Sequence, residues 1–232
     1  MIDALPPLAH QYLPVLQAEV RQHWPDAPLK SAFAGQVEQE TCITLKHRKC
    51  WSPYAELKTS REYGFGLGQI TITLKFDNFK EAKKLSPTLK DWSWDNRYNA
   101  VYQLRTLVLT NRFNYGKFGF ATKPTERMAF TLAAYNGGLG GVLSDRRVCV
   151  ATVGCEPTRW FGHVEKTSRK AKVAVSGYGK SFFEINRSYV MSILCVRRFK
   201  YKAAFPDFSD LGCKSDTPSI YPSWRIHGSI PL

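Results

Sequence analysis

The chain has 232 residues, of which 33 are Lys or Arg and 19 are Asp or Glu, so its formal net charge is +14. An apolar fraction of 44% and an aromatic fraction of 13% exclude an intrinsically disordered chain. The apolar runs are short, which excludes a membrane-spanning helix, and residues 1–7 lack the basic and apolar regions of a secretory signal. We therefore expect one domain, made without a signal peptide.

The first predicted element is an amphipathic helix near the N-terminus. An apolar residue recurs at every fourth position after Pro6 and Pro7, namely at Leu8, Tyr12, Leu16 and Val20. Pro14 lies inside this stripe and should kink or divide the helix. We treat residues 1–23 as a helical extension of the main domain.

Helical periodicity continues along the chain. A second helix is predicted over about 30–40, where Phe33, Val37 and Glu40 share a face, and a third over 96–112, where Val101, Leu104 and Val108 are in register. Pro124 starts a fourth that ends at Asn136-Gly137-Gly138, and a fifth covers about 186–202 with Tyr189, Ile193 and Val196 on one face. Gly and Thr in 64–73 predict a short hairpin. The fold class is therefore α+β and mostly helical, with an irregular tail after 205.

The six cysteines fall in close sequence pairs: Cys42 and Cys50, Cys149 and Cys155, Cys195 and Cys213. No CxxC and no Cys/His array with zinc spacing is present, so we expect no metal site. Disulfides in an oxidising compartment and idle thiols in a reducing one both remain open, because sequence does not determine connectivity.

Basic residues cluster at 46–49, 166–172 and 197–202. Such a charge favours binding to polyanions, among them nucleic acid, anionic lipid surfaces and the bacterial envelope. The alternative for each cluster is a solvated surface that serves solubility. No nucleic-acid-binding motif is present, so we expect no nucleic-acid partner.

Glu40 is the first candidate for chemistry. It should lie at the inward-facing end of a largely apolar helix, where partial burial raises a carboxyl pKa and suits a general acid. A helix-terminal Glu that faces water fits the spacing as well. The segment Gly64–Gly68 is glycine-rich but opens no βαβ unit, so a phosphate site there is weakly supported.

Three segments taken in order resemble a known family. Gln39-Glu40-Thr41, Gly66-Leu67-Gly68-Gln69 and Ala134-Tyr135-Asn136-Gly137-Gly138 resemble the family 1 soluble lytic transglycosylase domain, which carries Glu-Ser, Gly-Leu-Met-Gln and Ala-Tyr-Asn-Ala-Gly. The resemblance covers about residues 24–201. The segments 95–104, 160–165 and 188–190 are similar to further family segments. Thr41 replaces the usual Ser and keeps its hydroxyl, whereas Gly68 replaces Met and so lacks a side chain that would help to line the cleft.

This resemblance implies a lysozyme-like catalytic domain over 24–205, followed by the tail 206–232. It implies cleavage of peptidoglycan between N-acetylmuramic acid and N-acetylglucosamine to a 1,6-anhydro product, with Glu40 as acid and then base. Tyr135 would hydrogen-bond the Glu40 carboxyl. Ser60, Gln69, Asn136 and Tyr189 match cleft residues. No cofactor is implied.

A compact domain without a signal sequence resembles a bacteriophage endolysin of this type. It would be made in the host cytoplasm, act on peptidoglycan glycan strands in the periplasm as a monomer, and be attracted to the anionic envelope by its charge. Goose-type lysozymes, which are hydrolases, share related segments but carry an Asp where this chain has Ser60. Glu62 keeps the hydrolase alternative open, and a purely cationic binding protein is a further alternative.

Overall fold

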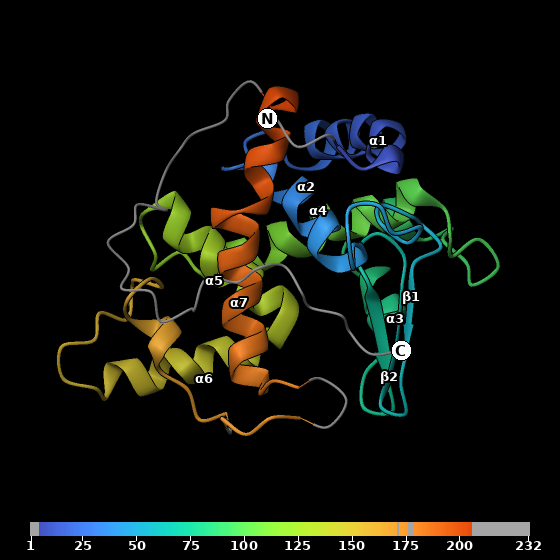
Figure 1. Ribbon diagram of the computed structural model, residues 1–232. Helices are drawn as coiled ribbons and strands as arrows, with labels where there is room; N and C mark the ends of the chain where they lie inside the picture. The colour runs from blue at the N-terminus through green and yellow to red at the C-terminus, as the bar shows by residue number, and fades with distance from the viewer. Residues whose placement is uncertain (1–4, 171, 176–178, 206–232) are drawn as a thin grey trace. The chain divides into compact units, whose positions relative to one another are not determined.

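The computed structural model describes residues 5–170, 172–175 and 179–205, and the expected tail 206–232 lies outside them. These residues are mostly helical, with one small antiparallel sheet, as the sequence predicted (Figure 1). They divide into two compact units. Unit 1 extends to Phe113 and resumes at Val196, whereas unit 2 extends from Asn114 to Cys195. The expected boundaries at 23 and 205 stay predictions.

The first helix of unit 1, α1 (Pro7–His23), begins at the predicted proline, and Leu16 and Val20 of the predicted stripe are buried. Pro14 does not divide it, so that part of the expectation was wrong. Pro14 has no N–H, so the carbonyl of His10 lacks its helical hydrogen-bond donor. Both Pro14 and His10 are exposed, so water can donate to this carbonyl instead.

The second helix, α2 (Ser31–Thr41), confirms the prediction over 30–40. Its residues from Ser31 to Glu38 are all buried. α2 packs against α1 and, more extensively, against the 3-10 helix η3 (Arg197–Ala204). The core of unit 1 therefore surrounds the helix that carries Glu40.

The sheet of unit 1 has three antiparallel strands in sequence order, β1 (Glu56–Lys58), β2 (Glu62–Phe65) and β3 (Ile70–Thr73). β2 and β3 confirm the predicted hairpin, with Gly64 opposite Thr71. β1 was not predicted, because a three-residue strand with one apolar residue, Leu57, has no periodicity to detect.

Short helices cover the sheet. α3 (Asn78–Ala82) packs on β3 and is capped by Asp77, whose side chain accepts a hydrogen bond from the Lys80 amide, and η1 (Pro87–Leu89) follows. A buried cluster joins sheet, short helices and α4: Phe65, Ile70, Phe79, Ala82, Leu89, Trp92 and Leu109.

The long helix α4 (Ala100–Lys117) contributes residues to both units. It begins four residues later than predicted, and the Asn99 side chain accepts a hydrogen bond from the Val101 amide at its start. Leu104 and Val108 are buried as predicted, but Val101 is 38% exposed, so that part of the prediction was wrong.

Unit 2 contains α5 (Pro124–Gly137), α6 (Leu139–Val150), the 3-10 helix η2 (Val164–Lys166) and α7 (Phe182–Cys195), and α5 packs against both α6 and α7 (Figure 1). α5 confirms the prediction, and Gly138 ends it with φ +80°. α6 was not predicted; it begins directly after Gly138, the residue at which the preceding helix was expected to stop. α7 ends at Cys195, so the predicted helix to 202 was wrong there. Val196 leaves helical geometry and is exposed.

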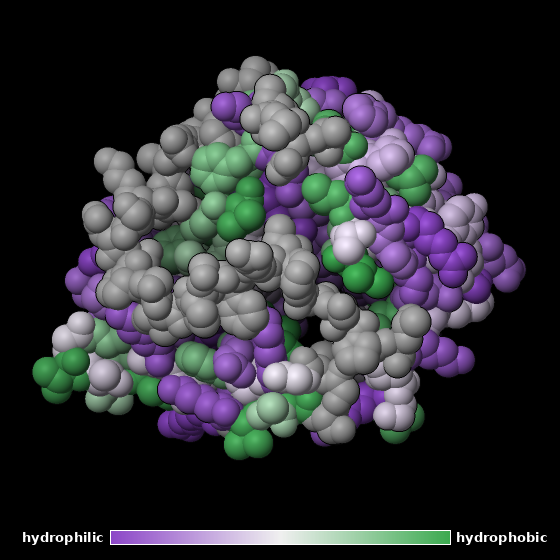
Figure 2. Space-filling model, viewed as in Figure 1, coloured by the Kyte–Doolittle hydropathy of each residue, from purple (hydrophilic) through white to green (hydrophobic). Residues whose placement is uncertain are grey.

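None of the helices among the described residues is both long enough and apolar enough to cross a membrane. On the face in Figure 2, the coloured surface is mostly hydrophilic, and apolar residues form small separate groups.

Candidate functional site

Glu40 lies in the last turn of α2, one residue before the helix ends. Its side chain is half-buried, in contrast to the buried run before it. A carboxyl at such a position is partly desolvated yet still reachable by a ligand. The partial burial of Glu40 therefore agrees with the partial burial expected of a general acid. Its catalytic role stays a prediction.

The fully buried carboxylate of α2 belongs to Glu38, which points into η3. Its Oε1 accepts a hydrogen bond from Arg197 Nη1 at 2.6 Å and lies 2.8 Å from Lys200 Nζ. Its Oε2 accepts one from the Tyr201 hydroxyl at 2.7 Å. Burial, followed by the Glu38 charge, raises the pKa of Tyr201 well above its usual value, so this phenol remains a proton donor.

This network shows how the basic residues of the cluster 197–202 are used. Arg197 and Lys200 are nearly buried and neutralise Glu38, while Arg198 is fully buried. Neither polyanion binding nor a solvated surface describes these side chains. A carboxylate held by two cations and a phenol ties the end of α2 to η3.

The residues next to Glu40 are fixed as well. Gln39 Oε1 accepts a hydrogen bond from Arg197 Nε at 2.7 Å. Thr41 Oγ1 donates to the Val37 carbonyl at 2.7 Å and accepts from the Trp51 amide at 2.9 Å. The hydroxyl that Thr41 shares with the Ser of the resembled family therefore joins the helix end to a distant loop.

A disulfide and an indole strengthen the same connection. Cys42, the residue that ends α2, is bonded to Cys50. The next residue, Trp51, is fully buried, and its Nε1 donates to the Tyr201 hydroxyl at 2.8 Å. The loop after Glu40 is thus closed covalently and anchored in the core of unit 1.

The turn between β2 and β3 carries Gln69. Gly66 has φ +79°, and a Cβ there would lie 2.4 Å from the Cδ atom of Gln103 of α4, so this position requires glycine. Gln103 is fully buried, accepts from the Leu67 amide at 2.9 Å, and donates to the Pro53 and Arg97 carbonyls. One glutamine side chain therefore supports the whole turn.

Gln69 itself is half-buried with φ +43°. Its Nε2 donates to the Ala55 carbonyl at 3.1 Å and the Gly66 carbonyl at 2.9 Å. The side-chain nitrogen of Gln69 is thus used inside the turn. This favours a structural role for Gln69, in shaping the bottom of a binding site, over direct donation to a sugar.

Ser60 and Glu62 lie at the other end of the sheet's first hairpin. Thr59 closes this turn, since its amide donates to the Glu62 carbonyl and its hydroxyl accepts from the Arg61 and Glu62 amides. Ser60 is exposed in the turn, and Glu62 is half-buried at the start of β2.

In unit 2, Tyr135 and Asn136 occupy the last turn of α5, where Tyr135 is half-buried and Asn136 exposed. Asn186 of α7 donates to the Ala133 carbonyl at 2.9 Å and to Asn136 Oδ1 at 3.0 Å. Gly137 leaves room for this contact, because a Cβ would lie 2.7 Å from Asn186 Nδ2 and the Asn186 side chain would have to shift. α7 thus holds the end of α5, and Tyr189 of α7 is buried.

A buried charge pair extends this arrangement. Arg187 Nη1 donates to Asn186 Oδ1 at 2.9 Å, and its Nη2 donates to Asp145 Oδ2 of α6 at 2.8 Å. Lys170 Nζ lies 3.8 Å from the same carboxylate, and burial lowers the pKa of Lys170. The charge pair connects α6 and α7 with the turn that carries Asn136.

The segment 160–165, which is similar to a family segment, packs beneath α5. Trp160 is fully buried, and the Trp160 and Phe161 amides donate to Glu126 Oε2 at 2.6 and 3.1 Å. Glu165 Oε1 accepts from the Gly162 amide, and burial raises the pKa of Glu165. These two carboxylates stabilise a loop.

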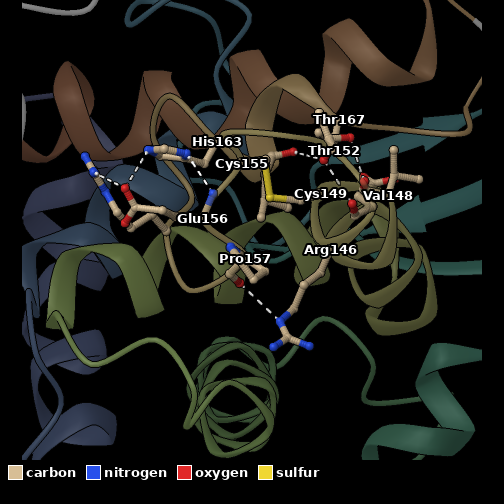
Figure 3. Close-up of a disulfide and its surroundings, with 12 residues drawn as sticks. Arg146, Val148, Cys149, Thr152, Cys155, Glu156, Pro157, His163 and Thr167 are labelled. Atoms are coloured by element: carbon tan, nitrogen blue, oxygen red, sulfur yellow. Dashed lines mark hydrogen bonds and ion pairs between the residues drawn. A yellow bond between two sulfur atoms is a disulfide. The ribbon is translucent and has the colours of Figure 1, made fainter.

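The second disulfide, Cys149–Cys155, closes the end of α6 (Figure 3). Figure 3 also shows His163 accepting from the Glu156 amide at 3.0 Å and Arg146 donating to the Pro157 carbonyl at 3.1 Å. Cys195 is disulfide-bonded too, whereas Cys213 lies outside the described residues. Disulfides, rather than idle thiols, therefore describe these five cysteines.

Of the predicted site residues, Glu40, Ser60 and Gln69 belong to unit 1, and Tyr135, Asn136 and Tyr189 to unit 2. The hydrogen bond expected between Tyr135 and Glu40 stays a prediction. In the part of the chain that the structure describes, no three His, Cys, Asp or Glu side chains gather as metal ligands. Comparison with known protein families and with curated proteins finds no match.

Sequence reasoning missed Glu38, Gln103 and Asn186, which hold the three motif segments in position. For Glu38 the sequence did contain a signal. A carboxylate on a largely apolar helix needs cationic partners once it is buried, and the segment 197–202 contains several cations. For Gln103 and Asn186 no local signal exists, because their partners are main-chain carbonyls far away in sequence.

Proposed function

We propose that this protein is a peptidoglycan lytic transglycosylase with a lysozyme-like fold. The observation that carries the proposal is the setting of Glu40, a half-buried carboxyl on the last turn of a buried helix whose flanking side chains are all fixed. A catalytic acid needs such a rigid support, since catalysis depends on sub-ångström placement. The order of the three motif segments supports the same function.

In this reaction Glu40 donates its proton to the glycosidic oxygen, and the bond from that oxygen to C1 of the muramic residue breaks. The acetamido group of the same residue stabilises the positive charge at C1. The Glu40 carboxylate then takes the proton from the O6 hydroxyl, and O6 bonds to C1. The product is a 1,6-anhydro sugar, no water is consumed, and Glu40 regains its proton.

The remaining candidates have supporting roles in the proposal. Tyr135 orients the Glu40 carboxyl and Ser60 contacts the reacting sugar, whereas Tyr189, which is only 4% exposed, lines the same site as a largely buried side chain. Gln69 and Asn136 shape the floor of the cleft, a role that suits the hydrogen bond from Gln69 to its own turn and the one that Asn136 accepts from Asn186.

A single catalytic carboxylate distinguishes this reaction from hydrolysis. Glycosidases that use water or a covalent intermediate need a pair of flanking carboxylates. Glu38 cannot be the second one, because two cations and a phenol already occupy its oxygens. Glu62 is the residue that a muramidase on this fold would use.

We further propose a phage endolysin that acts in the periplasm on the glycan strands. The disulfides support an oxidising place of action. The charge of +14 would concentrate the enzyme at the anionic envelope, even though Arg197, Arg198 and Lys200 of the cluster 197–202 are used internally. Lysis should then weaken as ionic strength rises, and a flat salt profile would contradict this role of the charge.

The test is mass spectrometry of the fragments released from purified peptidoglycan by the wild type and by Glu40→Gln, Glu62→Gln and Glu81→Gln. We expect products one water lighter than hydrolysed muropeptides, a loss of about 10²–10⁴-fold in rate for Glu40→Gln, and normal rates for the other two. Hydrated products that disappear in Glu62→Gln would replace the proposal with a muramidase. An absence of products would leave binding as the function.

A further inference from the structure

Unit 1 carries a group of partly exposed aromatic rings at the edge of its core, and the proposed reaction does not use them. We call Tyr54, Tyr63, Trp94, Arg97 and Tyr98 the aromatic platform. Trp94 is 43% exposed and Tyr54 68% exposed, whereas such large rings are normally mostly buried. Single exposed rings are common, but a contiguous group of them is typical of a binding surface.

The rings form a continuous set. The Tyr54 and Tyr98 centroids are 5.1 Å apart, and those of Tyr63 and Trp94 are 6.2 Å apart. The Arg97 guanidinium bridges the two pairs, 4.5 Å from the Trp94 ring and 4.4 Å from the Tyr98 ring. Buried Phe65 contacts the rings of Tyr63, Trp94 and Tyr98 from below.

Polar bonds fix the orientation of the rings. Glu56 Oε1 accepts hydrogen bonds from the hydroxyls of both Tyr63 and Tyr98. Arg97 Nη2 donates to the Tyr98 hydroxyl at 3.1 Å and Nη1 to the Trp94 carbonyl at 3.0 Å. The phenol bonds lower the pKa of Glu56, so the carboxylate is ionised at neutral pH and balances Arg97.

We propose that the aromatic platform binds the glycan strand by stacking against the apolar faces of N-acetylhexosamine rings. Pyranose rings have C–H groups on their faces and hydroxyls at their edges. They therefore fit flat aromatic surfaces with a few oriented polar groups between them. A nucleic acid is less favoured, because Glu56 offsets Arg97 where a phosphate-binding groove would need unpaired cations.

The platform adjoins the turn that carries Gln69. Gln103 donates to the Arg97 carbonyl and accepts from the Leu67 amide, and Gln69 donates to the carbonyl of Ala55, next to Tyr54. If Gln69 lies beside the substrate strand, as the proposed function requires, the platform would lengthen the surface that holds this strand. The inference therefore rests on the proposed function.

Binding, measured separately from cleavage, tests the platform. In a Glu40→Gln background, calorimetric titration with the tetramer of N-acetylglucosamine and co-sedimentation with purified peptidoglycan would compare Trp94→Ala, Trp94→Tyr and Tyr54→Ala. Phe182→Ala is the matched control, because Phe182 is a similarly exposed ring of unit 2. We expect both alanine variants to bind roughly tenfold more weakly, since an aromatic ring that becomes covered by its ligand contributes about that much. Trp94→Tyr should recover much of the loss and Phe182→Ala should bind normally.

The outcomes separate the two proposals. Weakened binding in the alanine variants without any anhydro product would support the platform and reject the transglycosylase. Anhydro products together with unchanged binding in Trp94→Ala would do the reverse. No binding to either glycan, or a Trp94-dependent affinity for an oligothymidylate in place of glycan, would overturn the platform.

Discussion

The buried network around Glu38 makes the sharpest prediction about stability. Glu38→Ala removes a carboxylate that is 0% exposed and leaves two cations whose side chains are only 14% and 13% exposed. Little water can reach these charges, so we expect a loss of about 3–5 kcal/mol, the usual effect of breaking a buried ion pair. That is a large part of a typical folding free energy of about 5–15 kcal/mol.

Tyr201→Phe is a milder change in the same network and should cost less stability than Glu38→Ala. It removes one hydrogen bond to Glu38 and one from the Trp51 indole but keeps the ion pairs. A hydrogen bond to a charged group contributes about 1.5–3 kcal/mol, so this variant should lose less than Glu38→Ala.

Urea unfolding, followed by far-ultraviolet circular dichroism and tryptophan fluorescence, measures both changes. With a slope of about 2 kcal/mol/M, Glu38→Ala should lower the midpoint by about 1.5–2.5 M. Glu81→Ala is the control, because its ion pair with Lys84 is exposed and should contribute little. A midpoint for Glu38→Ala equal to that of Glu81→Ala would refute the idea that η3 anchors α2.

Three further predictions concern the turns and the titrating groups. Gly66→Ala should cost about 2–4 kcal/mol in urea unfolding, because it combines a positive φ with a clash against Gln103, whereas Gly116→Ala, where a Cβ meets nothing, should be neutral or stabilising. Joint replacement of Cys42 and Cys50 by serine should cost about 2.5 kcal/mol by the loop-entropy relation, and reductant should destabilise the wild type more than this variant, which keeps the Cys149–Cys155 disulfide. Burial raises the folded-state pKa of Glu165, so the ionised form opposes folding; wild-type stability relative to Glu165→Gln should therefore fall as pH rises from 4 to 7, and a difference independent of pH would contradict this.

Periodicity was sufficient to predict most of the helices but not their ends. α2 and α5 were predicted nearly to the residue, because apolar residues recur at helical spacing in both and a glycine stop ends α5. The end of α7 was misjudged, since Val196 continues the apolar spacing but leaves helical geometry in order to start η3. Local patterns do not report such breaks, because tertiary contacts between η3 and α2 determine them.

The candidate site shows the same limit. Motif order singled out Glu40, Gln69 and Asn136, and the structure adds that each lies at the end of an element or in a turn. The side chains that hold those ends come from residues far away in sequence, such as Gln103 for the β2–β3 turn. Their type is readable from the sequence, but their partners are main-chain atoms, which have no sequence signature.

This arrangement has a mechanical consequence. The ends of helices and turns have unpaired main-chain groups and are the least stable parts of an element, so a functional residue there is imprecise unless other elements hold it. Here Glu38 fastens the end of α2, Gln103 the β2–β3 turn and Asn186 the end of α5. Glu38, Gln103 and Asn186 are buried and use their polar atoms in hydrogen bonds or ion pairs. Even conservative substitutions at these positions should therefore displace the motif residues, although the substituted side chains lie outside the motifs' own sites. Loss of function by substitution in this fold will therefore extend well beyond the residues that contact substrate.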